Sequence, residues 1–280
     1  MGQVILMSEA ADAVRAEIDF LTPVSVSPFA YGYDPAPEEP PASATFTAHT
    51  VPIHDVRRFG PLGIEENGAT LLDAPTAIRD FYAADIEGRY YPEAADHIRA
   101  ALGASRVVVF DHNIRRGSGL KLRPERYDQG RPVHHAHTDY TEASAARRLR
   151  DEFGGGAREL VRGRYLQVNL WRPIRAPLRD APLAVCDGAT VNTRSLRRVE
   201  LRYRDRCGEI YYLTHDPGQV WFYASDMGTD EAWLFKNFDS APAGPGWIAP
   251  HSAFEDPRRE RPVTPRESIE VRAFAFFDER

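Results

Sequence analysis

The part of the chain from Ser105 onwards reads as a succession of short strands, and this pattern limits the fold more than any other feature. Runs of β-branched and aromatic residues alternate with turn-forming residues at short intervals. About eight strands spaced in this way are typical of a jelly-roll barrel, a mainly β fold with helices packed outside. Besides a strand through His137, the seven candidates in this count are Tyr165–Trp171, Leu183–Cys186, Val199–Tyr203, Glu209–Leu213, Gln219–Tyr223, Ala232–Phe238 and Ser268–Phe277, and Arg106–Asp111 is a further buried strand candidate before them.

The first third of the chain has a different pattern of residues, with a proline-rich segment and several candidate helices. The run from Pro23 to Pro41 is rich in proline and predicts an extended arm lying on the body. The pattern also predicts a strand over Ala42–Arg57 and helices over Glu9–Phe20, Pro75–Ile86, Pro92–Leu102 and Thr141–Phe153. We expect one domain over residues 1–280, in which an N-terminal arm and helices (1–104) pack on a jelly-roll core (105–280).

Composition excludes several classes of protein. The 280 residues are 42% hydrophobic and 27% charged, which are ordinary globular values. A net charge of −6 gives no electrostatic footprint for nucleic acid, and no apolar run approaches a membrane span. Two cysteines cannot form a disulfide framework. We therefore expect a cytoplasmic protein whose partner is a small molecule, and its oligomeric state stays open.

The stretch Pro132–Thr141 holds the most informative polar residues. In a strand, side chains two apart share a face, so His135, His137 and Asp139 would point the same way. His137 and Asp139 then offer an imidazole and a carboxylate from one short lip of backbone. With His251 as a third ligand, they would form the two-histidine, one-carboxylate set that non-haem Fe(II) oxygenases use.

Arg266 and Ser268 follow His251 by about one loop and share a strand face. A guanidinium can hold a carboxylate through two parallel hydrogen bonds, and a hydroxyl can add a third. Arg272 lies on the same face and competes with Arg266 for this role, although it could instead pair with Glu270. Arg266 is favoured over Arg272 because it lies nearer the mouth of the barrel and has Ser268 as a partner.

These residues and the sequence segments that flank them resemble the Fe(II)/2-oxoglutarate-dependent oxygenase superfamily. The resemblance is strongest to the branch that groups the asaB-type hydroxylase/desaturases, gibberellin desaturase and the small cephamycin methoxylation protein. It covers roughly Val107 to Phe276. Its segments are Phe110-Asp-His, Val168-Asn-Leu-Trp-Arg-Pro173, Trp221-Phe-Tyr, Phe235-Lys-Asn-Phe-Asp-Ser240, His251-Ser-Ala-Phe and Pro265-Arg-Glu-Ser-Ile-Glu-Val-Arg272.

The resemblance implies a double-stranded β-helix that binds Fe(II) and uses 2-oxoglutarate and O2 as co-substrates. It implies that His137, Asp139 and His251 hold the iron, and that Arg266 and Ser268 hold the distal carboxylate of 2-oxoglutarate. Asn169 is an additional candidate for the co-substrate site, although it is nearly as well explained as a barrel-wall amide. The expected reaction is hydroxylation, desaturation or cyclisation at an unactivated C–H bond of a specialised metabolite, with release of succinate and CO2.

Other readings of the same residues stay open. His135 and Glu142 would replace Asp139 as ligands in a cupin-type metal protein, and His215 competes with His251. The chain could also be an iron oxidase that works without 2-oxoglutarate, or a non-catalytic partner subunit of a methyltransferase. Formation of succinate separates these alternatives from the main hypothesis.

Overall fold

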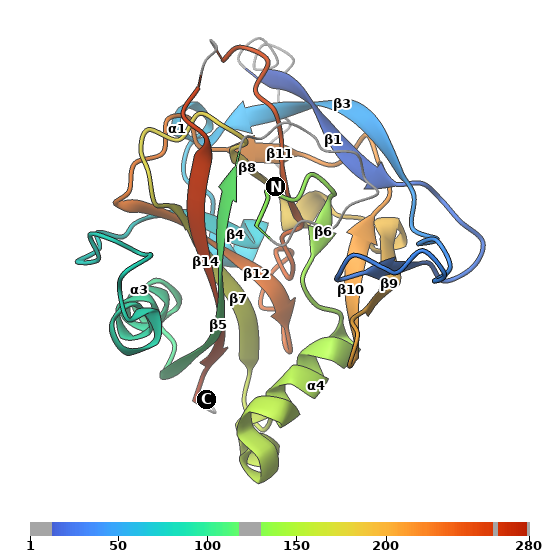
Figure 1. Ribbon diagram of the computed structural model, residues 1–280. Coiled ribbons are helices and arrows are strands. Elements are labelled where there is room, and N and C mark those ends of the chain that lie inside the picture. Colours follow the sequence, from blue (N-terminus) through green and yellow to red (C-terminus); the bar gives the residue numbers. More distant parts are fainter. Residues whose placement is uncertain (1–12, 118–129, 260–262, 279–280) are drawn as a thin grey trace.

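The computed structural model describes residues 13–117, 130–259 and 263–278, and within them two β-sheets form the framework of the fold (Figure 1). The larger sheet has nine strands in the order β1-β3-β11-β8-β13-β6-β10-β9-β2, and the smaller has five in the order β4-β12-β7-β14-β5. The strands are β1 (Val14–Leu21), β2 (Phe29–Tyr31), β3 (Phe46–Asp55), β4 (Ala69–Asp73), β5 (Arg106–Gly117), β6 (His137–Thr138), β7 (Tyr165–Pro173), β8 (Leu183–Cys186), β9 (Leu196–Arg202), β10 (Cys207–Leu213), β11 (Trp221–Tyr223), β12 (Glu231–Asp239), β13 (His251–Ala253) and β14 (Arg266–Phe276). The α-helices are α1 (Val56–Phe59), α2 (Ile64–Asn67), α3 (Tyr91–Leu102), α4 (Glu142–Phe153) and α5 (Ala157–Leu160).

The five-stranded sheet has one apolar and one polar face, and this division positions the site. On β14, the apolar residues from Ile269 to Ala275 at alternate positions pack with Leu166, Val168 and Leu170 of β7 beneath α3. The intervening residues of the two strands therefore point to the opposite face, towards the larger sheet. They are Arg266, Ser268, Glu270 and Arg272 on β14 and Gln167, Asn169 and Trp171 on β7.

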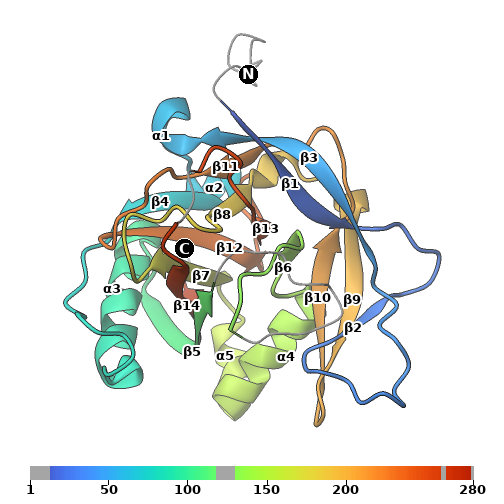
Figure 2. The same ribbon diagram turned by 45° about the horizontal axis from the view of Figure 1, so that its top comes forward.

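The nine-stranded sheet curls, so that β1 returns to the segment that precedes β6 (Figure 2). The amide of Asp19 donates to the carbonyl of His134 at 3.1 Å, and the amide of Ala136 donates to the carbonyl of Asp19 at 2.9 Å. These bonds fix the segment that leads into His137. The predicted helix over Glu9–Phe20 is wrong where the structure describes it, because Val14–Leu21 is a strand. The buried residues there recur every second position, which is the period of a strand.

The helix predictions divide into two groups. Those over Pro92–Leu102 and Thr141–Phe153 are confirmed: Gly103 ends α3 in the left-handed conformation, and the Thr141 side chain caps α4. The helix predicted over Pro75–Ile86 is wrong, because turns occupy that segment and a π-helical turn begins only at Ile86. Asp80 Oδ1 accepts hydrogen bonds from the amides of Tyr82 and Ala83, and such local bonds compete with helix formation.

The strand predictions after Ser105 are confirmed to within a few residues, and β5 extends well beyond the predicted end at Asp111. The arm after β1 contributes β2, which pairs with β9. Among the described residues, no helix combines the length and the hydropathy that crossing a membrane requires.

Candidate metal centre and its cavity

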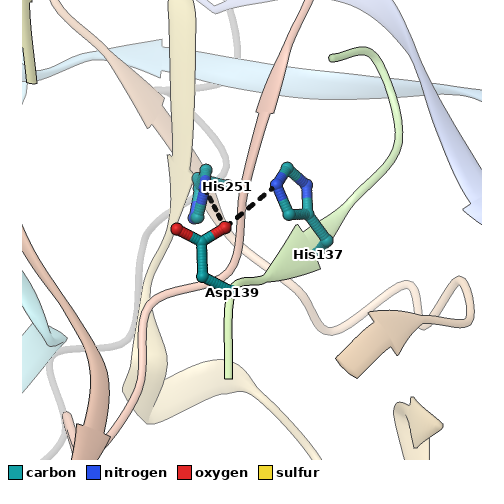
Figure 3. Close-up of side chains that lie close together, drawn as sticks. All are labelled: His137, Asp139 and His251. Carbon is teal, nitrogen blue, oxygen red and sulfur yellow. Dashed lines mark ion pairs between the residues drawn. The ribbon is translucent and has the colours of Figure 1, made fainter. Parts of the chain in front are cut away.

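His137, Asp139 and His251 lie together between the two sheets (Figure 3). His137 and His251 are direct partners across the antiparallel pair of β6 and β13, so their side chains share a face. Asp139 follows β6 by one residue. Its Oδ1 lies 3.6 Å from His137 Nε2 and 4.0 Å from His251 Nε2. One ligand atom from each residue falls within 4.8 Å of the others, as a shared metal ion requires.

Both imidazoles present Nε2 to the centre. His137 Nδ1 lies 2.7 Å from the carbonyl oxygen of His135, and His251 Nδ1 lies 3.5 Å from that of Ala249. A proton on Nδ1 that faces a carbonyl leaves the lone pair of Nε2 directed at the metal. Burial, assisted by the other imidazole, lowers the pKa of His251 to about 3, and burial also lowers the pKa of His137. Both rings are therefore neutral at neutral pH, which is the form that binds a metal.

Asp139 is the anionic member of the group. Burial alone would raise the pKa of its carboxyl group, but Arg272 and the two histidines outweigh burial and hold that pKa well below its usual range. Two neutral nitrogens and one carboxylate oxygen on one face fit Fe(II), because this set leaves the opposite face open. The donor chemistry thus suits the ion that the sequence predicts.

A cavity opens beside these three side chains. Its empty space, part of the mouth included, is about 320 Å³. Apart from the triad, its walls are Arg115, Val133, Trp171, Leu183, Ser252, Ala253, Arg266 and Glu270. The cavity therefore joins a potential metal centre to two guanidinium groups.

Arg266 is held as a buried cation that faces this cavity. Only 3% of the residue is exposed, its Nε donates to Ser268 Oγ at 3.0 Å, and its Nη1 donates to the carbonyl of Ala181 at 2.8 Å. Among the described residues, no carboxylate pairs with its guanidinium, and its Nη2 donates no hydrogen bond. Burial, with Arg115 nearby, lowers the pKa of Arg266 to about 9, so it remains charged at neutral pH. A buried, unpaired guanidinium is a ready site for an anion.

Arg115 is a cavity residue that the sequence pattern did not reveal. It lies on β5 directly opposite Ser268 on β14, and its Nη1 donates to the carbonyl of Arg131 at 3.0 Å. The predicted strand ended at Asp111 because the residues after it are polar. Asp111, Asn113 and Arg115 continue the alternation of the strand, and this pattern could have predicted that the strand and its inner face extend beyond Asp111.

The two other candidates for the co-substrate site contact Asp139 instead. Asn169 Nδ2 donates to Asp139 Oδ2 at 2.8 Å, and Arg272 Nε donates to the same oxygen at 2.7 Å. Neither residue is part of the cavity wall. Arg272 also pairs with Glu270, as the sequence suggested.

The rival metal ligands lie elsewhere. His135 stacks on Phe46 with ring centroids 3.7 Å apart, and His215 stacks on His49 at 4.1 Å. Glu142 accepts a hydrogen bond from the hydroxyl of Tyr211. The structure therefore does not bring the cupin-type set together within the described residues.

Comparison with known proteins agrees with this geometry. Residues 18–276 match a family model described as an oxidoreductase/YMDC permease-like domain. The chain is 32% identical over 255 residues to the Fe(II)/2-oxoglutarate-dependent dioxygenase nvfI of Aspergillus novofumigatus, covering 88% of this chain and 90% of the relative. It is 34% identical over 223 residues to the alpha-ketoglutarate-dependent dioxygenase phiK of a fungal species, covering 76% and 79%. The solved structure of the iron and alpha-ketoglutarate-dependent endoperoxidase NvfI superimposes with a TM-score of 0.85 at 27% identity and covers 96% of this chain and 100% of that one.

Fold, site and relatives together define a non-haem iron oxygenase of the jelly-roll type that requires Fe(II), 2-oxoglutarate and O2 and acts on a small molecule. Within that class, the chain belongs to the family of asaB-type hydroxylase/desaturases. The predicted fold class and class of enzyme are confirmed, in preference to the oxidase and partner-subunit alternatives.

Proposed function

We propose that His137, Asp139 and His251 hold Fe(II) at the floor of the cavity, and that Arg266 and Ser268 bind the distal carboxylate of 2-oxoglutarate. One observation carries this proposal: the three potential ligands and an unpaired, buried guanidinium face the same cavity. The Ser268 hydroxyl accepts from Arg266 Nε, so its own proton is available for the carboxylate.

Each of these residues has a defined share in the chemistry. Iron held by these residues would, together with 2-oxoglutarate and O2, supply the oxidising power for an unactivated C–H bond, with succinate and CO2 as the co-products. The protein fixes the co-substrate at both ends, which sets its orientation before the reaction. Trp171 and Leu183 form apolar wall around the polar groups and exclude water. The way in which the cavity orients the substrate would decide between hydroxylation, desaturation and cyclisation.

Arg115 is a second cation for the same end of the cavity. Its position opposite Ser268 places it beside Arg266 on the inner face of the sheet. Two guanidiniums next to each other repel, and a bound carboxylate removes that penalty. We assign Arg115 to the co-substrate anchor as an addition to the arginine-serine pair.

Several features of the protein stay predictions from the sequence. We propose that residues 1–280 form a single domain with its catalytic core in 105–280, and that the protein is cytoplasmic. A homo-oligomeric state also stays open. The substrate is proposed to belong to specialised metabolism, as the resemblance to the asaB branch implies.

Turnover of 2-oxoglutarate tests the proposed function. Protein is loaded with Fe(II) and 2-oxoglutarate under argon and then exposed to O2. The amount of succinate formed is measured with and without a panel of small organic molecules as candidate substrates. The wild-type enzyme should form succinate, whereas His137→Ala, Asp139→Ala and His251→Ala should lose both iron and turnover. His135→Ala and His215→Ala are matched controls that should retain iron. Loss of iron in His135→Ala with retention in Asp139→Ala would overturn the assignment.

A further inference from the structure

The two oxygens of Asp139 have different surroundings. Oδ1 faces the nitrogen atoms of His137 and His251, at 3.6 and 4.0 Å. Oδ2 points away from them and accepts hydrogen bonds from Asn169 Nδ2 at 2.8 Å and Arg272 Nε at 2.7 Å. Because a carboxylate oxygen has about two lone pairs, these bonds use the accepting capacity of Oδ2.

The main chain at Asp139 is fixed as well. Asp139 lies just beyond β6, so no ladder of the sheet holds it. Its amide donates to Asn237 Oδ1 at 3.0 Å, and Asn237 is only 2% exposed. Asn237 lies where the register between β12 and β7 shifts, so the bulge presents its amide group inward. Side chains from three strands therefore hold Asp139: those from β7 and β14 bond its carboxylate, and that from β12 bonds its main chain.

Two further ion pairs hold the Arg272 side chain in this position. Its Nη1 pairs with Asp111 Oδ2 at 3.0 Å, and its Nη2 pairs with Glu270 Oε1 at 2.9 Å. These bonds leave Nε for Asp139. The guanidinium is thus locked on three carboxylates, and its side chain is only 11% exposed. Such a guanidinium serves to orient its partners rather than to bind a ligand.

We propose that Arg272 and Asn169 are positioning residues that reserve Oδ1 of Asp139 as its single metal-binding oxygen. A carboxylate can bind a metal through one oxygen or two, and the second mode uses an additional coordination position. With three protein atoms, an octahedral ion keeps three positions, which suffice for a two-point chelate of 2-oxoglutarate and for O2. If Oδ2 also bound, one of these would be lost. This inference rests on the proposed function.

Three substitutions separate positioning from simple stability. Asn169→Ala removes one donor to Oδ2 without changing charge, and Arg272→Lys keeps the charge but loses the fork. Gln167→Ala is the matched control, because Gln167 is equally buried on the same face of β7, two residues from Asn169, and donates to no described residue. Thermal unfolding of the metal-free proteins shows whether each variant folds.

The measurements use Mn(II) as the probe, so that no turnover is needed. Loss of an outer hydrogen-bonding partner of a metal ligand typically costs about 10-fold to 100-fold in metal affinity. We expect such a loss in Asn169→Ala and Arg272→Lys, and wild-type affinity in Gln167→Ala. Infrared difference spectra between loaded and metal-free protein report whether a carboxylate binds through one oxygen or two, from the separation of its two stretching bands. Subtraction of the Asp139→Ala spectrum assigns these bands.

The wild-type protein and Gln167→Ala should show the wide band separation of one-oxygen binding, and the two variants should shift towards the narrow separation of two-oxygen binding. An unchanged separation in folded Asn169→Ala and Arg272→Lys would overturn the inference, whatever their affinity. Failure of the proposed function would look different, because the wild-type protein itself would then bind no Mn(II) through Asp139.

Discussion

Replacement of Arg266 by alanine should greatly weaken the binding of 2-oxoglutarate while the metal still binds. Arg266 is 3% exposed, its guanidinium carbon lies 4.8 Å from the Trp171 ring centroid, and the guanidinium has no carboxylate partner among the described residues. Its removal takes away the bidentate partner of the distal carboxylate in a desolvated place and leaves Arg115 as the cation nearby. None of the three proposed iron ligands hydrogen-bonds to Arg266 in the structure.

The magnitude follows from the burial. Truncation of one partner of a buried charge pair costs about 2 to 5 kcal/mol, and about 1.4 kcal/mol corresponds to tenfold in affinity. The dissociation constant for 2-oxoglutarate should therefore rise roughly 30-fold to several thousand-fold. Ser268→Ala removes one hydrogen bond to a charged group, worth about 1.5 to 3 kcal/mol, or about 10-fold to 150-fold. Arg266→Lys should also bind poorly, because an ammonium group cannot reproduce the fork.

Calorimetric titration of 2-oxoglutarate into protein saturated with Mn(II) measures these constants without turnover. Arg179→Ala is the control, because this arginine is 62% exposed at its side chain and pairs with Asp226 at the surface. It should bind 2-oxoglutarate like the wild-type protein. If folded Arg266→Ala binds within about twofold of the wild type, the assignment of the anchor is refuted, since 0.4 kcal/mol or so is far below a buried charge pair.

Three further outcomes follow from the structure. Arg115→Gln should weaken 2-oxoglutarate binding by about tenfold or more in the same calorimetric assay, and an unchanged constant would remove Arg115 from the anchor. Asp239→Asn should destabilise the protein to chemical denaturation by about 1.5 to 3 kcal/mol, because the carboxylate accepts a hydrogen bond from the fully buried Lys236 at 3.0 Å, and Lys236 keeps its bond to Glu65 in the variant. Burial acts to raise the pKa of the Asp239 carboxyl group, but Arg164 and Lys236 outweigh burial, so the pKa in the folded protein lies below its ordinary value. The carboxylate therefore stabilises the fold above about pH 4, and this contribution is lost as the pH falls through the lowered pKa. Stability should thus fall less steeply below pH 4 in Asp239→Asn than in the wild type, and equal slopes would contradict the pairing. Ile18→Ala should cost about 2 to 5 kcal/mol in the same denaturation assay, and Arg15→Ala, an exposed neighbour on β1, within about 0.5 kcal/mol; similar losses in both would count against the strand.

The pattern of the sequence predicted the site better than its surroundings. His137 and Asp139 are two residues apart, so a local rule placed them on one face, and the arginine-serine motif that follows His251 favoured it as the third ligand independently of the resemblance. The direct pairing of His137 with His251 depends on the register of β6 and β13, which no local pattern encodes. His135 shows the limit of the local rule: it is two residues from His137, yet it stacks on Phe46, because the regular strand begins only at His137.

The missed features share a physical cause. Val14–Leu21 alternates like a strand, but its charged residues also suited an amphipathic helix, and pairing with β3 decided the outcome. Arg272 was read as a partner of Glu270, which it is, but its bond to Asp139 joins residues that lie far apart in sequence. Contacts of this kind arise when sheets pack, so they were out of reach of periodicity alone.

The most direct test of the metal centre is the visible absorption spectrum of the anaerobic protein with Fe(II) and 2-oxoglutarate. If His137, Asp139 and His251 hold iron beside the Arg266 anchor, a charge-transfer band should appear only when both additions are present. The band should be lost in Asp139→Ala and persist in His135→Ala. A wild-type protein that binds both Fe(II) and 2-oxoglutarate in equilibrium dialysis, yet shows no such band, would contradict the placement of the co-substrate on the iron.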